Sequence, residues 1–173
     1  MIDRPMTSPL ETLDTIDAKI LELLQVNASL SVAEISEQVG LSPSPCWRRI
    51  KRLEDDGIIK HRVTVLDKQK LGLGFEVFVT VKLAFPNREN MEKFEKAVNT
   101  MPEVVQCAVV TGATDFMLRI VTKDMRSYED FLREVLLGIE IISDVQSRIV
   151  LRQSKESYAL PLSLISKSSP SRF

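Results

Sequence analysis

The chain has 173 residues, of which 44% are hydrophobic and 27% charged, and its formal net charge is −1. This composition predicts a packed core, and the length allows one large domain or two small ones. The near-zero net charge excludes a global field that draws in nucleic acid, so any such attraction must come from a local patch. Cys46 and Cys107 read as small buried apolar residues, and with a single histidine, His61, we expect no metal site.

The sequence also disfavours several other classes of protein. No run approaches the roughly 18 apolar residues of a membrane span, and the start, MIDRPMTSPLET, lacks the apolar core of a signal peptide. We therefore expect a cytoplasmic protein with no membrane partner. We find no phosphate loop and no Cys/His pair spaced for catalysis, so we assign no catalytic residue. Residues 1–12 are polar with two prolines and are expected to be disordered.

The next segment, residues 13–66, has the pattern of three helices followed by one or two wing strands. Apolar residues recur at helical spacing over 13–27. Ser31 and Glu34 form the capping box of a helix over 32–39, and Gly40 is suited to its left-handed end. Ser42 or Ser44 then caps a further helix, with Pro43 or Pro45 in its first turn. Gly57 closes that helix, and 58–66 is the expected wing.

One face of this last helix is apolar, because Cys46, Ile50 and Leu53 repeat at i, i+4 and i+7. Cations dominate the rest: residues 48–62 contain six Lys/Arg and three Asp/Glu, and the acids all lie at the far end of the helix. A charge run alone would favour a solvated face, with Lys51–Asp55 and Arg52–Asp56 as i, i+4 pairs. In a helix-turn-helix, however, the second helix enters the DNA major groove, so the context favours double-stranded DNA as the partner.

The pattern changes after the expected linker, residues 67–74. Strands are predicted over 75–85, 104–111, 116–122 and 141–152, and amphipathic helices over 88–101 and 125–137. In the second helix we expect an inward-facing set of Tyr128, Phe131, Leu132, Val135 and Leu136. The order β-α-β-β-α-β predicts a ferredoxin-like domain, so the whole chain is assigned to the α+β class.

The strings LDTIDAKILELL, SVAEISEQVGLSPSPCWRRIKRLEDDGII and VTGATDFMLRI together resemble the Lrp/AsnC (feast/famine) transcriptional regulators over roughly residues 13–160. The resemblance implies a winged helix-turn-helix over 13–66 and an effector-binding and oligomerisation domain over 75–160, with 161–173 as a tail. It also implies homodimers that assemble into tetramers or octamers. The implied effector is an amino acid or related small molecule, and no further cofactor is expected.

The resemblance also implies which residues meet DNA. Four lie at the start of the recognition helix, where bases are read: Ser44, Pro45, Trp47 and Arg48. For Trp47, packing against the wing or the first helix is an equal alternative. Arg49 either clamps a phosphate or braces the domain internally. Phosphate contacts, which position without specifying sequence, are expected from Lys51, Arg52, Lys60 and Arg62.

The effector is expected at the loop Gly112, Ala113, Thr114 and Asp115, which matches the family's G-x-x-D. A glycine permits close backbone approach, exposed amides can meet a carboxylate, and Asp115 can pair with an ammonium group. The alternative is a tight β-turn in which Asp115 bonds local backbone. The family's frequent proline-glycine-valine turn before the last strand is replaced here by LLGIEIISDV, which puts the pocket's shape in doubt.

Two other functions compete with a metabolite-responsive regulator. One is an architectural DNA-binding protein of the same fold without an effector, which the altered LLGIEIISDV turn supports. The other is an enzyme, because a ferredoxin-like fold alone does not exclude chemistry. The absence of a catalytic constellation in the sequence argues against the enzyme.

Overall fold

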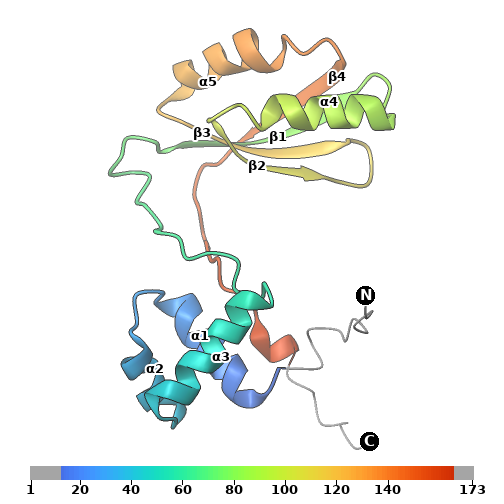
Figure 1. Cartoon of the computed structure of the whole chain (residues 1–173). Helices are drawn as coiled ribbons and strands as arrows, with labels where there is room; N and C mark the ends of the chain where they lie inside the picture. The colour runs from blue at the N-terminus through green and yellow to red at the C-terminus, as the bar shows by residue number, and fades with distance from the viewer. Residues whose placement is uncertain (1–12, 166–173) are drawn as a thin grey trace, which may run out of the picture. The chain divides into compact units, whose positions relative to one another are not determined.

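The computed structural model describes residues 13–165, which form two compact units (Figure 1). The first, here called the three-helix unit, consists of residues 13–64 and 155–165. The second, the sheet unit, consists of residues 65–154. The expected N-terminal segment 1–12 and the end of the expected tail lie outside the described residues. The last described residues, 155–165, therefore group with the N-terminal helices and not with the sheet that precedes them.

The three-helix unit contains α1 (Thr15–Val26), α2 (Val32–Val39), α3 (Pro43–Asp55) and the short 3-10 turn η3 (Leu162–Leu164). The expected helices are confirmed. Their inward faces meet in one apolar cluster, which confirms the periodicity of both α1 and α3. The fully or nearly fully buried members are Ile20, Leu21, Ile35, Cys46, Ile50 and Leu53.

The helix ends follow the local chemistry of the sequence. The Ser31 side chain caps α2, and the Glu34 carboxylate accepts a hydrogen bond from the Ser31 N–H at 2.7 Å, which confirms the capping box. Gly40 has φ +70°, the left-handed conformation that ends a helix without the steric cost of a Cβ. At α3, Ser42 occupies the capping position, but its side chain makes no capping hydrogen bond.

Residues 58–66 differ from expectation, because this stretch of the described chain forms no strand. Ile58 and Ile59 still pack against the apolar cluster of the three-helix unit, and the Ile59 N–H bonds to the Leu53 carbonyl at 3.0 Å. From residue 60 to 66 every side chain is exposed. A strand requires a neighbour for its backbone groups, and this segment has no strand partner within the described chain.

The sheet unit has the expected β-α-β-β-α-β order. Its elements are β1 (Phe75–Leu83), α4 (Arg88–Val98), β2 (Val104–Val109), β3 (Phe116–Thr122), α5 (Met125–Phe131) and β4 (Ile142–Ile149). The strands are antiparallel in the order β2-β3-β1-β4. β3 matches its expected bounds, and the other strands are shorter than expected by two to four residues. β1 and β4 leave the sheet at the same end, where Val77 pairs with Ile149.

Both helices of the sheet unit cover the same face of the sheet. Alternate residues of β1 and β3 join α4 and α5 in a single core, whose buried members include Val77, Val79, Val81, Phe94, Phe116, Leu118, Ile120 and Phe131. The rings of Phe94 and Phe116 lie 4.4 Å apart between α4 and β3. No helix of the described chain packs on the other face, which carries Glu76, Phe78, Thr80, Met117 and Arg119.

The second helix departs from its expected pattern at its end. α5 is followed by a π-helical turn over Leu132–Leu136, so one extra residue is accommodated there. The turn places Leu136 at 0% exposure and leaves Val135 at 40%, so the expected inward position of Val135 is wrong. A regular 3.6-residue period carried through this turn assigns the wrong neighbour to the core.

Candidate DNA-binding surface and effector loop

The start of α3 is open to solvent and carries the side chains expected to read bases. Trp47 is 54% exposed and Arg48 is also exposed. The indole does not belong to the apolar cluster beneath α3, so packing in the core is not its role. A large aromatic and a guanidinium on the outer surface of a helix are suited to contacts with base edges and methyl groups.

The first turn of α3 also carries a backbone donor. Pro43 and Pro45 have no N–H, and the Cys46 N–H bonds to the Ser42 carbonyl at 3.2 Å. This leaves the Ser44 N–H as the first-turn donor that the helix itself does not satisfy. Donors of this kind, together with the helix dipole, favour phosphate at a helix start.

Two of the expected DNA-contacting arginines bind carboxylates of the first helix. Arg49 donates to Asp14 at 2.6 Å and to Asp17 at 2.9 Å, while Arg52 donates to Asp17 at 2.5 Å. The expected pairing of Arg52 with Asp56 is therefore wrong. The Asp17 side chain is fully buried, and this arrangement supports the bracing alternative for Arg49.

Electrostatic interactions within this cluster favour the charged forms of Asp14 and Arg49. Burial alone would raise the pKa of Asp14, but the Asp17 N–H and the Arg49 guanidinium outweigh it and hold that pKa below its usual range. Hydrogen bonds to Asp14 and then Asp17 raise the pKa of Arg49. The sequence analysis did not identify either acid as a partner of these arginines. The signal that was available was the i, i+3 spacing of the two arginines, which places both on the same side of α3.

The remaining expected cations divide by their partners. Lys51 pairs with Asp55 at 2.8 Å on the exposed surface, as expected, and Arg62 pairs with Glu54 at 3.0 Å. Lys60 is exposed. Exposed pairs such as Lys51–Asp55 contribute only a few tenths of a kcal/mol, so either cation can exchange its partner for a phosphate at little cost.

The Gly112–Asp115 loop joins β2 to β3 at the far end of the sheet from the chain connections. Gly112 has φ +119°, a conformation that a side chain would strain, and it is exposed together with Ala113. Thr114 is half-buried. Asp115 accepts a hydrogen bond from the Leu83 N–H at 2.7 Å, and its own N–H bonds to the Val81 carbonyl at 2.9 Å. One carboxylate oxygen thus anchors the loop to the end of β1.

The turn before β4 is filled by its own apolar residues. Ile139 and Ile141 pack against the core of the sheet unit, and the Ala84 N–H bonds to the Ile141 carbonyl at 2.9 Å. Leu137 points outward and is 54% exposed. The residues that replace the family's proline-glycine-valine turn therefore extend the core.

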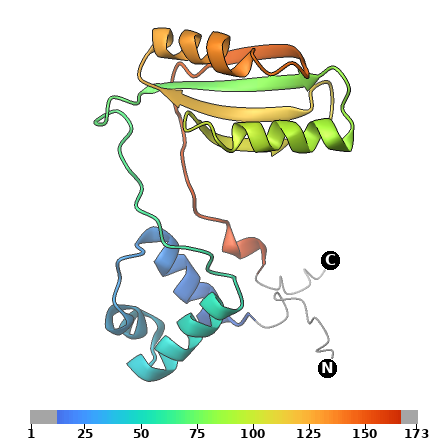
Figure 2. The same ribbon diagram turned by 45° about the horizontal axis from the view of Figure 1, so that its top comes forward.

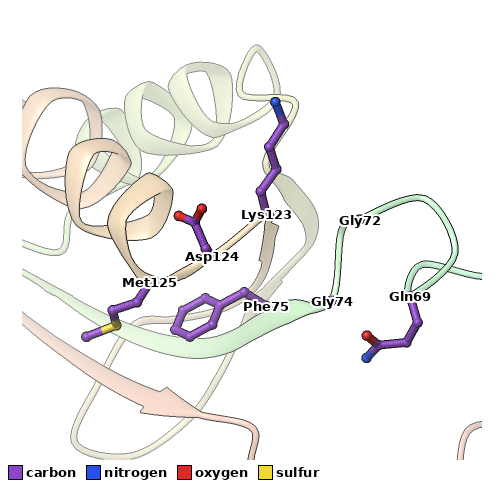
Figure 3. Close-up of a pocket in the computed structure, with 7 residues that line it drawn as sticks. All are labelled: Gln69, Gly72, Gly74, Phe75, Lys123, Asp124 and Met125. Atoms are coloured by element: carbon purple, nitrogen blue, oxygen red, sulfur yellow. The ribbon is translucent and has the colours of Figure 1, made fainter.

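A shallow pocket of about 400 Å³, which the sequence did not predict, lies at the connection end of the sheet (Figure 3). Its lining comes from the turn before β1 and from the β3–α5 junction: Gln69, Gly72, Gly74, Phe75, Lys123, Asp124 and Met125. Figure 3 shows Phe75 and Met125 on one side, with the Lys123 side chain pointing away from them. The charged groups therefore do not converge on the apolar wall.

A buried carboxylate at the same end fixes the turn before β1. Glu76 is 4% exposed, accepts from Arg119 at 2.5 Å and also pairs with Lys68. Burial raises its pKa, but the bonds from Arg119 and Lys68 outweigh this and hold the pKa below its usual value. Part of the expected linker is consequently attached to the sheet.

The comparisons with known proteins agree with both units. The family model for a winged helix-turn-helix DNA-binding domain matches residues 13–60, and the model for the Lrp/AsnC ligand-binding domain matches residues 76–160. The chain belongs to the Lrp/AsnC family. It is a DNA-binding transcriptional regulator with the ferredoxin-like second domain of that family.

Among Lrp/AsnC relatives, the DNA-binding transcriptional activator DecR of Escherichia coli strain K12 is 39% identical over 150 residues, covering 87% of this chain and 99% of DecR. The glutamate uptake regulatory protein of Zymomonas mobilis is also 39% identical, with coverages of 87% and 91%. A Neisseria meningitidis regulator crystallised as an L-Met complex has a TM-score of 0.86 at 39% identity, covering 90% of this chain and all of that one.

Within residues 13–165, no helix is long and apolar enough to cross a membrane, and no group of three or more His, Cys, Asp or Glu side chains could hold a metal ion. Cys46 and Cys107 are both free, and burial raises the pKa of each thiol. Cys46 is fully buried and Cys107 half-buried.

Proposed function

We propose that this regulator binds duplex DNA as a cytoplasmic homodimer, reads bases with the start of α3 and changes its assembly or DNA spacing when an amino acid or related metabolite binds. The observation that carries the DNA part is the exposure of Trp47 and Arg48 beside the Ser44 N–H. Two such helices would enter successive major grooves about 34 Å apart.

Within the expected DNA-contacting set, the contacts support a division of roles. Ser44, Pro45, Trp47 and Arg48 are proposed to face bases, and Lys51, Lys60 and Arg62 phosphates. Arg49 and Arg52 are proposed to act mainly through Asp17, by fixing α3 on α1 at 2.9 Å and 2.5 Å. With three to five phosphate contacts per chain, DNA affinity should fall steeply with salt.

The face of the sheet that α4 and α5 leave uncovered is proposed as the dimer surface. It carries the half-buried Phe78 of β1 and Met117 of β3, which is 42% exposed. Apolar side chains on an open sheet face are stabilised by a second layer. Assembly of such dimers into tetramers or octamers is part of the proposal.

The effector is proposed to bind at the Gly112–Asp115 loop. One Asp115 oxygen is used by the Leu83 N–H, so the second oxygen is the group proposed to pair with a ligand ammonium. The exposed amides around Gly112 suit a carboxylate. The regulator crystallised with L-Met and the glutamate uptake regulator support an amino acid as the chemical class.

An architectural protein without an effector is the second candidate. The observation that favours it is the packing of Ile139 and Ile141 into the core, which fills the turn that often walls the family's pocket. Titration with each of the common amino acids, followed by the melting temperature, separates the two. A specific ligand raises the melting temperature by linkage, and a flat result across the set would favour the architectural protein.

The DNA role is tested by replacing Arg48 and Lys51 separately with alanine. Loss of a base contact through Arg48→Ala should weaken binding by about 1–3 kcal/mol, or roughly fivefold to 150-fold. Lys51→Ala should weaken binding to all sequences and reduce the salt slope by about one. Arg88→Ala is the matched control, because Arg88 is an exposed cation on α4. Unchanged binding in both α3 variants, with an unchanged oligomer, would refute the assignment.

A further inference from the structure

The chain returns to the three-helix unit after it has completed the sheet. β4 ends at Ile149, and residues 155–165 belong to the same compact unit as α1, α2 and α3. Leu162 packs against their apolar cluster and is the one half-buried residue among 151–165. The ligand-binding family model stops at residue 160, so the turn η3 lies beyond both matched domains.

A single side chain of α1 holds this returning segment by its backbone. The Gln25 Oε1 accepts from the Leu160 N–H at 2.6 Å, and the Gln25 Nε2 donates to the Leu160 carbonyl at 3.3 Å. Both backbone groups of Leu160 are thus satisfied, while its side chain is 70% exposed. The contact joins residues 135 positions apart. Gln25 fixes the path of the chain, and Leu162 supplies the apolar contact.

Two connections consequently join the units, and Figures 1 and 2 show both. One enters β1 after α3, and the other leaves β4 and ends at α1. They meet the sheet side by side, because Val77 pairs with Ile149 and the Val150 N–H bonds to the Glu76 carbonyl at 2.9 Å. A unit held by one connection can swivel about it, whereas attachment at two separate points restricts that rotation.

We propose that residues 155–165 are a strap that docks on α1 and, as a second tether, limits the orientations available to the recognition helix. The strap also couples the sheet unit to the helices that include α3. Asp115 of the effector loop is bonded to the far end of β1 through Leu83 and Val81. β1 lies beside β4, and the strap follows β4 in the chain. The inference rests on the proposed DNA binding for its functional effect, but the docking itself does not.

Docking is tested first, without DNA, by amide hydrogen exchange in the full chain. The Leu160 amide should be protected in the wild type, and Gln25→Ala and Leu162→Ser should each speed its exchange at least tenfold. Glu22→Ala, an exposed change on the same helix, and Leu164→Ser, an 80% exposed change in the same turn, are the matched controls. Gln25→Ala removes an exposed side chain, so it remains informative if Leu162→Ser fails to fold. A wild-type Leu160 amide that exchanges at the free-peptide rate would overturn the proposal.

The tether role is tested on duplexes selected in vitro for binding by the wild-type chain. We would vary the centre-to-centre spacing of two half-sites from 10 to 16 base pairs. The wild type should prefer one spacing, and Gln25→Ala should reduce that preference at least fivefold while leaving single-half-site affinity unchanged. If hydrogen exchange shows that the strap is released in a variant and the spacing preference of that variant is nevertheless unaltered, the tether role is overturned. A wild type that binds no duplex would instead refute the proposed function, leaving docking to be decided by exchange alone.

Discussion

Removal of the Asp17 carboxylate should destabilise the three-helix unit more than any change to a surface ion pair. Asp17 is buried and accepts from Arg49 and Arg52, and its second oxygen also accepts the Asp14 N–H at 3.2 Å. Hydrogen bonds that involve charged groups contribute about 1.5–3 kcal/mol each to stability. In Asp17→Ala the two arginines lose their buried partner, and the return bond to the helix cap is lost as well.

The released guanidiniums recover part of this loss from water, because the Arg49 and Arg52 side chains are already 27% and 43% exposed. We therefore expect a loss of about 2–3 kcal/mol in the free energy of unfolding, below the sum of the separate bonds. For a unit of this size the corresponding fall in melting temperature is about 10–20 °C. DNA affinity measured below the transition should also fall, because α3 loses its attachment to α1.

The assay is thermal unfolding followed by circular dichroism, with hydrogen exchange on α1 and α3 to assign the transition to this unit. Asp55→Ala is the matched control, because it removes the exposed Lys51–Asp55 pair and should cost only about 0.3–0.5 kcal/mol. Asp17→Asn keeps the shape of the side chain and removes its charge, so comparison with Asp17→Ala separates the two contributions to stability. A melting temperature for Asp17→Ala within about 3 °C of the Asp55→Ala value would refute the bracing role.

Three further outcomes are expected. Trp47→Ala should weaken DNA binding while changing the unfolding free energy by less than about 0.5 kcal/mol, as measured by urea unfolding, because the indole is 54% exposed; a large loss of stability would contradict its surface role. Because the pKa of Glu76 is lowered, its ionised form stabilises the fold above the ordinary glutamate pKa of 4.5, and this stability is lost as the pH falls through the pKa of the folded state. Glu76→Gln should therefore flatten the acid limb of urea unfolding between pH 3 and 7. An acid limb as steep as that of the wild type would rule this out. Leu136→Ala should cost about 2–5 kcal/mol and Leu137→Ala under about 1, since Leu136 is buried and Leu137 is 54% exposed; equal losses by thermal melting would contradict the π-helical turn.

The elements that sequence reasoning predicted well are those specified by neighbouring residues. The Ser31–Glu34 box, the left-handed Gly40 and the alternation of β3 each depend on contacts within a few positions. β1 and β4 were predicted too long, because periodicity continues past the last paired residue and pairing ends a strand. Phe85 follows the alternation of β1 and is nevertheless 74% exposed.

The elements that escaped prediction depend on long-range partners. Asp17 meets arginines 32 and 35 positions away, and Gln25 meets a residue 135 positions away. Neither contact leaves a local pattern, because one acid in a first helical turn and one glutamine in a last turn are ordinary there. The π-helical turn after α5 is similar, since the requirement to bury Leu136 comes from the sheet beneath it.

The sorting of cations on α3 lies between these two cases. The apolar face is defined by Cys46, Ile50 and Leu53, and a helix turns by about 100° per residue. Arg48 and Lys51 therefore lie roughly opposite that face, while Arg49 lies beside it, within reach of α1. A wheel drawn from the sequence alone thus separates Arg48 from Arg49, but it does not separate Arg52 from Lys51, because both lie about 130° from the centre of the apolar face. The wheel also does not reveal the two acids that pair with Arg49 and Arg52, because the position of the acids depends on how α1 crosses α3. Arg48 should accordingly be tested first for base reading, and Arg49 and Arg52 should be tested first for stability.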